Sequence, residues 1–144
     1  MPNSQFAKTE TPCVGICSTI YGDHICRGCF RHYQDVIDWN TYLDSKKLEI
    51  LQTLDQHISN AMQDKIEIFD SELLRSKCTQ FHVKIRLSWS PYTWAHALLR
   101  EGIDRIQNLE KYGLQVTAPY VKMRLTKLVE LIDDEIHHAL DRTL

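Results

Sequence analysis

The sequence predicts a mainly α-helical protein with a minor β element, in which a cysteine knuckle precedes the helices. Three observations lead to this fold class. Residues 11–32 carry four closely spaced cysteines among turn-forming residues. Residues 33–57, 90–112 and 119–140 carry apolar side chains at the three- and four-residue spacing of amphipathic helices. Residues 81–89 alternate apolar and polar side chains, as a half-buried strand does.

Size and composition are those of an ordinary globular chain. The 144 residues fit one domain, or one domain with a small satellite. A net charge of −2 argues against nucleic acid as a general partner, because such binders carry a basic excess. The first residues are polar and no window approaches the roughly 18 consecutive apolar residues of a membrane helix. We therefore expect a cytoplasmic location without a membrane span, where thiols stay reduced.

The first third of the chain is expected to form a small module. Residues 11–32 are too short for an apolar core of their own, so a bound metal would supply the missing stability. Residues 33–43 predict a short helix, with apolar anchors that include a tryptophan. Asp44 or Ser45 can cap a second short helix that runs to about His57. The module is thus a four-cysteine knuckle followed by two short helices.

The predicted domain boundary follows this module. We expect residues 1–58 to form the cysteine-rich metal-binding module with its two short helices. Residues 59–144 are expected to form a mostly helical C-terminal region whose domain type is unknown. Residues 60–75 continue the helical spacing of the preceding helix. The stretch Ile66-Glu67-Ile68 also fits a strand, so both alternatives stay open there.

The remaining elements are one strand and two long helices. The alternating segment 81–89 needs a partner strand, and residues 65–69 and 114–117 are the candidates. A helix capped at Ser90 is expected to end at Gly113, because glycine favours the left-handed conformation that follows a helix. A last helix begins at Pro119, and the short link between the two helices predicts a C-terminal antiparallel helix hairpin.

The four clustered cysteines are the strongest functional signal. Cys13, Cys17, Cys26 and Cys29 have the spacing C-x3-C, eight residues, C-x2-C. Two such pairs, each closed by a short turn, can direct four thiolates at one centre. Zinc takes four sulfurs in tetrahedral geometry, and iron–sulfur clusters also take four thiolates. The spacing predicts a metal site at these four residues and leaves zinc and iron–sulfur open.

The surroundings of the cysteines support a charged thiolate site. Gly28 lets backbone N–H groups turn toward sulfur in the second cysteine pair. Arg27 and Arg31 add positive charge nearby. His24 and His32 are also able to ligate metal, but four cysteines already suffice, so a surface role is favoured for both.

These residues resemble a known family. The segments that carry the resemblance are residues 11–17, 26–31, 36–39 and 46–54. They are similar to the domain of unknown function 1289, a small bacterial family described as predicted iron–sulfur proteins. The resemblance covers about residues 11–57 and implies a knuckle, two short helices and four cysteine ligands. It implies no reaction.

The sequence therefore predicts a metal-binding protein rather than an enzyme, since no catalytic motif is present. The first hypothesis is a four-cysteine iron–sulfur cluster in electron transfer, redox sensing or a related role. The alternative is a structural four-cysteine zinc module that serves as an adaptor for an unidentified protein or a nucleic acid. A third reading is a redox-active dithiol at Cys26 and Cys29. Cys78 stands apart and is expected to be a small buried apolar residue.

Overall fold

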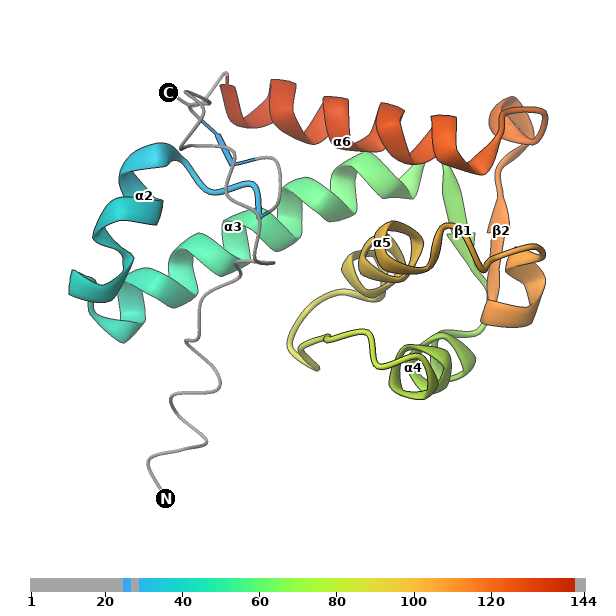
Figure 1. The fold of residues 1–144 in the computed structure, drawn as a ribbon, viewed down its shortest axis with the longest axis horizontal. Coiled ribbons are helices and arrows are strands. Elements are labelled where there is room, and N and C mark those ends of the chain that lie inside the picture. Colours follow the sequence, from blue (N-terminus) through green and yellow to red (C-terminus); the bar gives the residue numbers. More distant parts are fainter. Residues whose placement is uncertain (1–24, 27–28, 142–144) are drawn as a thin grey trace. The chain divides into compact units, whose positions relative to one another are not determined.

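The structure is a computed structural model that describes residues 25–26 and 29–141 of the 144-residue chain. Helices dominate this part, and its one sheet is an antiparallel pair of short strands (Figure 1). The mainly α-helical class with a minor β element is confirmed. The elements are α2 (Tyr33–Asp38), the 3-10 turn η2 (Trp39–Thr41), α3 (Asp44–Gln63), β1 (Ile66–Ile68), α4 (Ser71–Gln80), α5 (Pro91–Gly102), η3 (Leu109–Tyr112), β2 (Leu114–Val116), η4 (Ala118–Tyr120) and α6 (Leu125–Asp141).

The chain divides into two compact units. The first groups Met1–Leu54 with Ile136–Leu144, and the second is Asp55–Glu135. Helices α3 and α6 therefore each contribute residues to both units. Within the described part of the chain, no helix combines the length and the apolar character needed to cross a lipid bilayer.

In the first unit, the described end of the cysteine segment is a tight reversal of the chain. Ile25 and His32 form an isolated antiparallel bridge across it. Helix α2 then ends early, and its last turn tightens into η2 with a buried Trp39. The helix predicted over residues 33–43 is thus a short α-helix with a 3-10 extension. Helix α3 begins at Asp44 itself, next to the cap position that was predicted at Asp44 or Ser45, and runs one to two turns beyond its predicted end.

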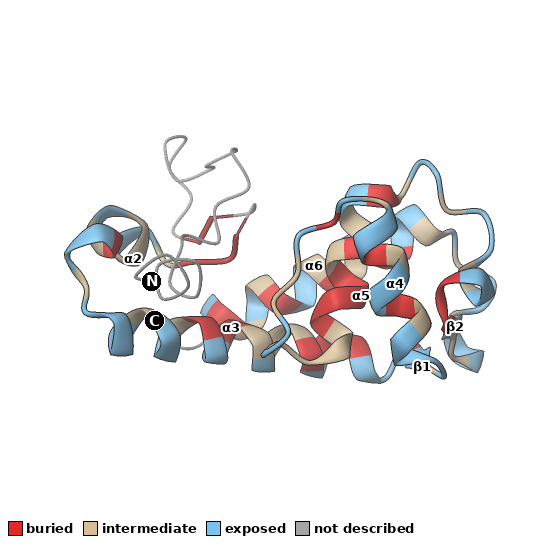
Figure 2. Ribbon diagram, turned by 90° about the horizontal axis from the view of Figure 1, so that it is seen from below, coloured by how far each residue is buried: buried red, intermediate tan, exposed pale blue. Residues whose placement is uncertain are grey.

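The core of the second unit lies between helices. Helix α5 buries most of its length, and Figure 2 shows its buried positions as a nearly continuous stretch. Helix α4 packs against it and contributes Leu74 and Cys78, both fully buried. Leu128 and Ile132 supply the apolar stripe of α6 in this unit. The prediction that Cys78 is a buried apolar residue is confirmed.

The small sheet corrects two predictions. Strand β1 pairs with β2 in antiparallel register, Ile66 opposite Val116 and Ile68 opposite Leu114. A continuous helix over residues 60–75 is therefore wrong, because α3 ends at Gln63 and α4 begins only at Ser71, and the strand alternative at Ile66–Ile68 is right. The strand predicted over residues 81–89 is also wrong.

The reason for the second error lies in backbone hydrogen bonds. The two segments proposed as partners for residues 81–89 pair with each other instead. The Val83 N–H donates to the carbonyl of Cys78 at 2.8 Å, which ties the segment to the end of α4. The carbonyl of Arg86 accepts the Trp94 indole N–H at 2.8 Å and the Trp89 N–H at 3.0 Å. These bonds hold turns, and they occupy groups that a strand ladder would need.

The predicted helix hairpin is a third correction. The first helix ends at Gly102 rather than at Gly113, and the last helix begins at Leu125 rather than at Pro119. The segment between them forms η3, β2 and η4. Gly113 does adopt the left-handed conformation, at φ 78°, but it ends η3. Figure 1 shows α5 nearly end-on while α6 runs across the view, so the two are not an antiparallel pair.

Candidate metal centre

The two cysteines of the second pair are buried, and backbone hydrogen bonds join the residues next to them. The sulfur-bearing side chains of Cys26 and Cys29 are buried, and both thiols are free of disulfide bonds. The carbonyl of Cys26 accepts the Phe30 N–H at 2.7 Å, and the Cys26 N–H donates to the carbonyl of Arg31 at 2.8 Å. Phe30 adopts a left-handed φ of 61°, which turns the chain sharply after the second cysteine. The loop thus holds two reduced cysteines away from water.

Arg31 lies against the second of these cysteines. Its Nε donates a hydrogen bond to Cys29 Sγ at 3.2 Å, although only 3% of the arginine is exposed. The guanidinium carbon stands 4.9 Å from the ring centroid of Trp39, a cation–π distance. Among the described residues, no carboxylate lies within ion-pair distance of this guanidinium. Arg31 is therefore clamped between a sulfur atom and an aromatic face.

The environment pulls the protonation of Cys29 in two directions. Burial raises the pKa of the Cys29 thiol above its usual value, and the neighbouring Cys26 adds to the rise. Hydrogen bonds from the Arg31 side chain and backbone, together with its positive charge, act in the opposite direction and favour the thiolate. Burial therefore favours the neutral thiol, and Arg31 favours the thiolate.

Apolar and aromatic side chains enclose this loop. Ile25 and Phe30 are almost fully buried. The ring of Phe30 meets the ring of His137 edge to face, with centroids 5.2 Å apart. Lys47 lies 5.9 Å from the ring centroid of Trp39, so a second cation contacts the same tryptophan. No local pattern predicted the contact with His137, because it joins residues that are more than a hundred positions apart in the chain.

Part of the predicted site lies outside the described residues. Cys13 and Cys17 are there, as are His24, Arg27 and Gly28. Within residues 25–26 and 29–141, no group of three or more His, Cys, Asp or Glu side chains is placed to hold a metal ion. His32 is half-buried and pairs its backbone with that of Ile25.

The described half of the site fits a thiolate metal centre. It offers two buried cysteines that form no disulfide, and a cation already hydrogen-bonded to the sulfur of one of them. Donors of this kind disperse the negative charge that four thiolates bring to a metal. The sequence identified Arg31 as a nearby charge, but its position on Trp39 follows only from the fold of α2 and η2.

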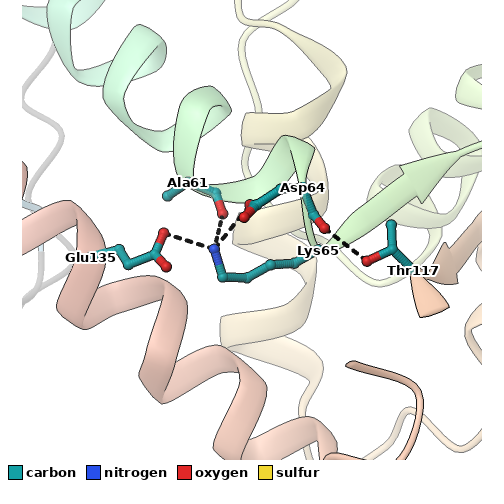
Figure 3. Close-up of polar contacts among 5 residues, drawn as sticks. All are labelled: Ala61, Asp64, Lys65, Thr117 and Glu135. Atoms are coloured by element: carbon teal, nitrogen blue, oxygen red, sulfur yellow. Dashed lines mark hydrogen bonds and ion pairs between the residues drawn. The ribbon is translucent and has the colours of Figure 1, made fainter. Parts of the chain in front are cut away.

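A second polar centre, at Lys65 in the other unit, escaped sequence analysis. The Lys65 side chain is fully buried, and its ammonium donates to the Ala61 carbonyl, to Asp64 and to Glu135 (Figure 3). Burial lowers the pKa of Lys65, but the hydrogen bonds and charges of Glu135 and Asp64 outweigh it and leave the pKa raised. A lysine that stays charged and saturated in this way holds structure together and is no nucleophile.

Helices α5 and α6 share one further buried polar contact. His96 Nε2 lies 2.7 Å from Asp133 Oδ1, and Arg100 reaches the other oxygen of that carboxylate at 3.6 Å. Burial lowers the pKa of His96 even though Asp133 opposes that shift. The contact is enclosed, with 3% of His96 exposed, and it positions the two helices.

Comparison with known proteins places the cysteine segment in a family. A family model described as "Protein of unknown function (DUF1289)" matches residues 11–58. The uncharacterized protein YdhL of Escherichia coli (strain K12) is 32% identical over 59 residues, which cover 41% of this chain and 73% of YdhL. YdhL of Shigella flexneri matches with the same identity and coverage. No solved structure matches the chain significantly. The chain belongs to the DUF1289 family, whose function is not known.

Proposed function

We propose that this chain is a metal-binding protein that holds an iron–sulfur cluster on Cys13, Cys17, Cys26 and Cys29. One observation carries the proposal. The two described cysteines are buried and form no disulfide, and Arg31 donates a hydrogen bond to the sulfur of Cys29. When bound, a cluster would supply one-electron chemistry for electron transfer or redox sensing.

The chemistry of the loop supports a metal over a reactive dithiol. Reactive thiols are partly exposed and have a lowered pKa. Cys29 is buried instead, and burial raises its pKa. A buried sulfur is suited to be a metal ligand, because it stays out of contact with reactive solutes. The cation at Arg31 suits an anionic four-thiolate centre.

Support for iron–sulfur over zinc comes from the resemblance to predicted iron–sulfur proteins and from the surroundings of Cys29. Hydrogen bonds to sulfur and low solvent exposure are the means by which proteins set cluster potentials. A four-cysteine zinc site carries a similar net negative charge, of about two units, and would accept the same surroundings. We place the protein in the cytoplasm, where cysteines stay reduced, and assign it no catalysis.

The test is elemental analysis of full-length protein made under iron-replete, oxygen-free conditions. We expect iron, acid-labile sulfide and a brown colour. Serine at any one of the four ligand positions should lower the bound iron. Cys78→Ser is the matched control. Cys78 is also buried, but it belongs to the second unit, where its sulfur lies 3.9 Å from the carbonyl of Trp94. It should keep wild-type stoichiometry.

Three other outcomes would overturn the proposal. A colourless protein with one zinc bound would replace the cluster by the structural zinc module. Metal-free protein with rapidly alkylated cysteines would favour the dithiol reading. Loss of metal in Cys78→Ser, with full metal in Cys13→Ser, would show that the proposed ligands are wrong.

A further inference from the structure

The least expected feature of the first unit is a buried arginine that has no acidic partner among the residues that the structure describes. Arg31 is 3% exposed, and no carboxylate of the described chain reaches its guanidinium. An arginine cannot shed its charge at any pH that a protein experiences. Burying an unpaired cation is costly, so the fold must provide an anion or another attractive group nearby. The group at hydrogen-bond distance is the sulfur of Cys29, at 3.2 Å.

A neutral thiol is a weak acceptor and cannot balance a guanidinium. A thiolate can, and a centre of four thiolates around a divalent metal or a cluster carries about two net negative charges. Arg31 would neutralise part of that charge from inside the fold. The negative face of the Trp39 ring, 4.9 Å from the guanidinium carbon, holds the cation in place by cation–π attraction.

We propose that Arg31 is the built-in counter-ion of the metal centre, and that Trp39 positions it against Cys29. The inference rests on the proposed function, since it requires metal-bound thiolates. It adds a role for the segment after the knuckle. Trp39 begins η2, which follows α2, and Lys47 of α3 contacts the same ring at 5.9 Å. Metal at the cysteines therefore tightens the packing of α2, η2 and the start of α3 through Arg31.

This arrangement makes a prediction that a purely structural arginine does not share. Removing the guanidinium deletes a favourable charge from the loaded protein. In the metal-free protein the same substitution removes a buried cation that has only a thiol, and no metal-bound thiolate, beside it. We expect Arg31→Gln to lower the melting temperature of the loaded protein but to leave that of the metal-free protein unchanged or higher. A structural arginine would lower both.

The second readout is loss of metal to an excess of chelator, followed by absorbance. Partners that hydrogen-bond to metal ligands change metal affinity about 10- to 100-fold when mutated. We therefore expect Arg31→Gln to release its metal at least about tenfold faster than wild type. If the centre is a cluster, the variant should also have a lower midpoint potential, because a nearby cation favours the more negative reduced state.

Two variants and one control complete the design. Arg31→Lys keeps the charge, so it should fold and load fully, but its release should be intermediate because an ammonium lacks the flat face and the Nε donor. Trp39→Leu should likewise release metal faster. Arg75→Gln removes an exposed arginine of α4 and should match wild type.

The outcomes separate this inference from the proposed function. Wild-type protein without metal overturns both. Wild-type protein that loads normally, with Arg31→Gln and Arg31→Lys releasing metal at the wild-type rate, overturns only the counter-ion role. Equal destabilisation of the loaded and metal-free forms by Arg31→Gln would also overturn it, since the arginine would then act through packing alone.

Discussion

Lys65 offers the sharpest test of how the second unit is held together. Its ammonium lies 2.9 Å from the Ala61 carbonyl, 3.0 Å from Asp64 and 2.7 Å from Glu135, and its side chain is fully buried. The ammonium also stands 5.7 Å from the ring centroid of Tyr120. The question is whether the charge or the aliphatic stem of the lysine contributes more to stability. We expect the aliphatic stem to contribute more to stability than the charge.

The magnitudes follow from exposure. The side chains of Asp64 and Glu135 are 62% and 44% exposed, so water replaces the ammonium when it is removed and little is left unsatisfied. Lys65→Met keeps a stem of similar length and should cost about 1 kcal/mol, the net worth of hydrogen bonds that solvent can replace. Lys65→Ala removes three methylenes, each worth about 0.8 kcal/mol, and leaves a cavity. We expect it to cost about 3–4 kcal/mol in total.

The assay is urea unfolding of the full chain, followed by circular dichroism, for wild type, Lys65→Met, Lys65→Ala and the exposed control Lys127→Ala. The control should stay within about 0.5 kcal/mol of wild type. If Lys65→Met is as unstable as Lys65→Ala, the reasoning is refuted, because the charge would then contribute more to the free energy of unfolding than the aliphatic stem does. Unequal m-values would show that the unfolded ensemble changed instead.

Two further predictions concern the second unit. Gly113→Ala should lower the melting temperature by several degrees, because the residue is left-handed at φ 78° and an added Cβ would overlap a neighbouring backbone carbonyl. Gly102→Ala is its control, since the nearest atom to the new Cβ is 3.6 Å away, and it should hold or raise the melting temperature. Burial lowers the pKa of His96 below 6.5, so the unfolded chain binds the extra proton first. Stability should be full above about pH 6.5 and fall as the pH drops below it. His96→Asn should flatten that slope in melts between pH 7 and pH 5; an unchanged slope would contradict the assignment.

Several features followed from the sequence because they depend on neighbours along the chain. A helix that begins close to Asp44, the burial of Cys78 and the strand alternative at Ile66–Ile68 were all predicted. A cap, an apolar position or a run of β-branched residues acts locally, so one segment carries enough information. The spacing of the four cysteines is local in the same sense, and it led to the family that the comparisons show.

Local patterns failed where two segments competed for the same partner. Residues 81–89 alternate well enough for a strand, yet β1 and β2 pair with each other and leave that segment to turns. Helical spacing continued beyond Gly102, but the structure forms turns and η3 over the residues that follow. The spacing of apolar residues and the intrinsic propensity of each residue indicate which elements a segment can form. Pairing with other segments in the folded protein then decides which of them it does form.

The four-cysteine spacing, the helical class and the positive charge near the knuckle can all be read from the chain without its fold. The contacts that this charge makes depend on the fold. Arg31 lies on Trp39 and against Cys29 because α2 and η2 bring the tryptophan back over the loop. Likewise, Lys65 is buried because α6 carries Glu135 to it from seventy residues away. Contacts between segments so distant in the chain depend on how the helices pack, and no local pattern encodes them.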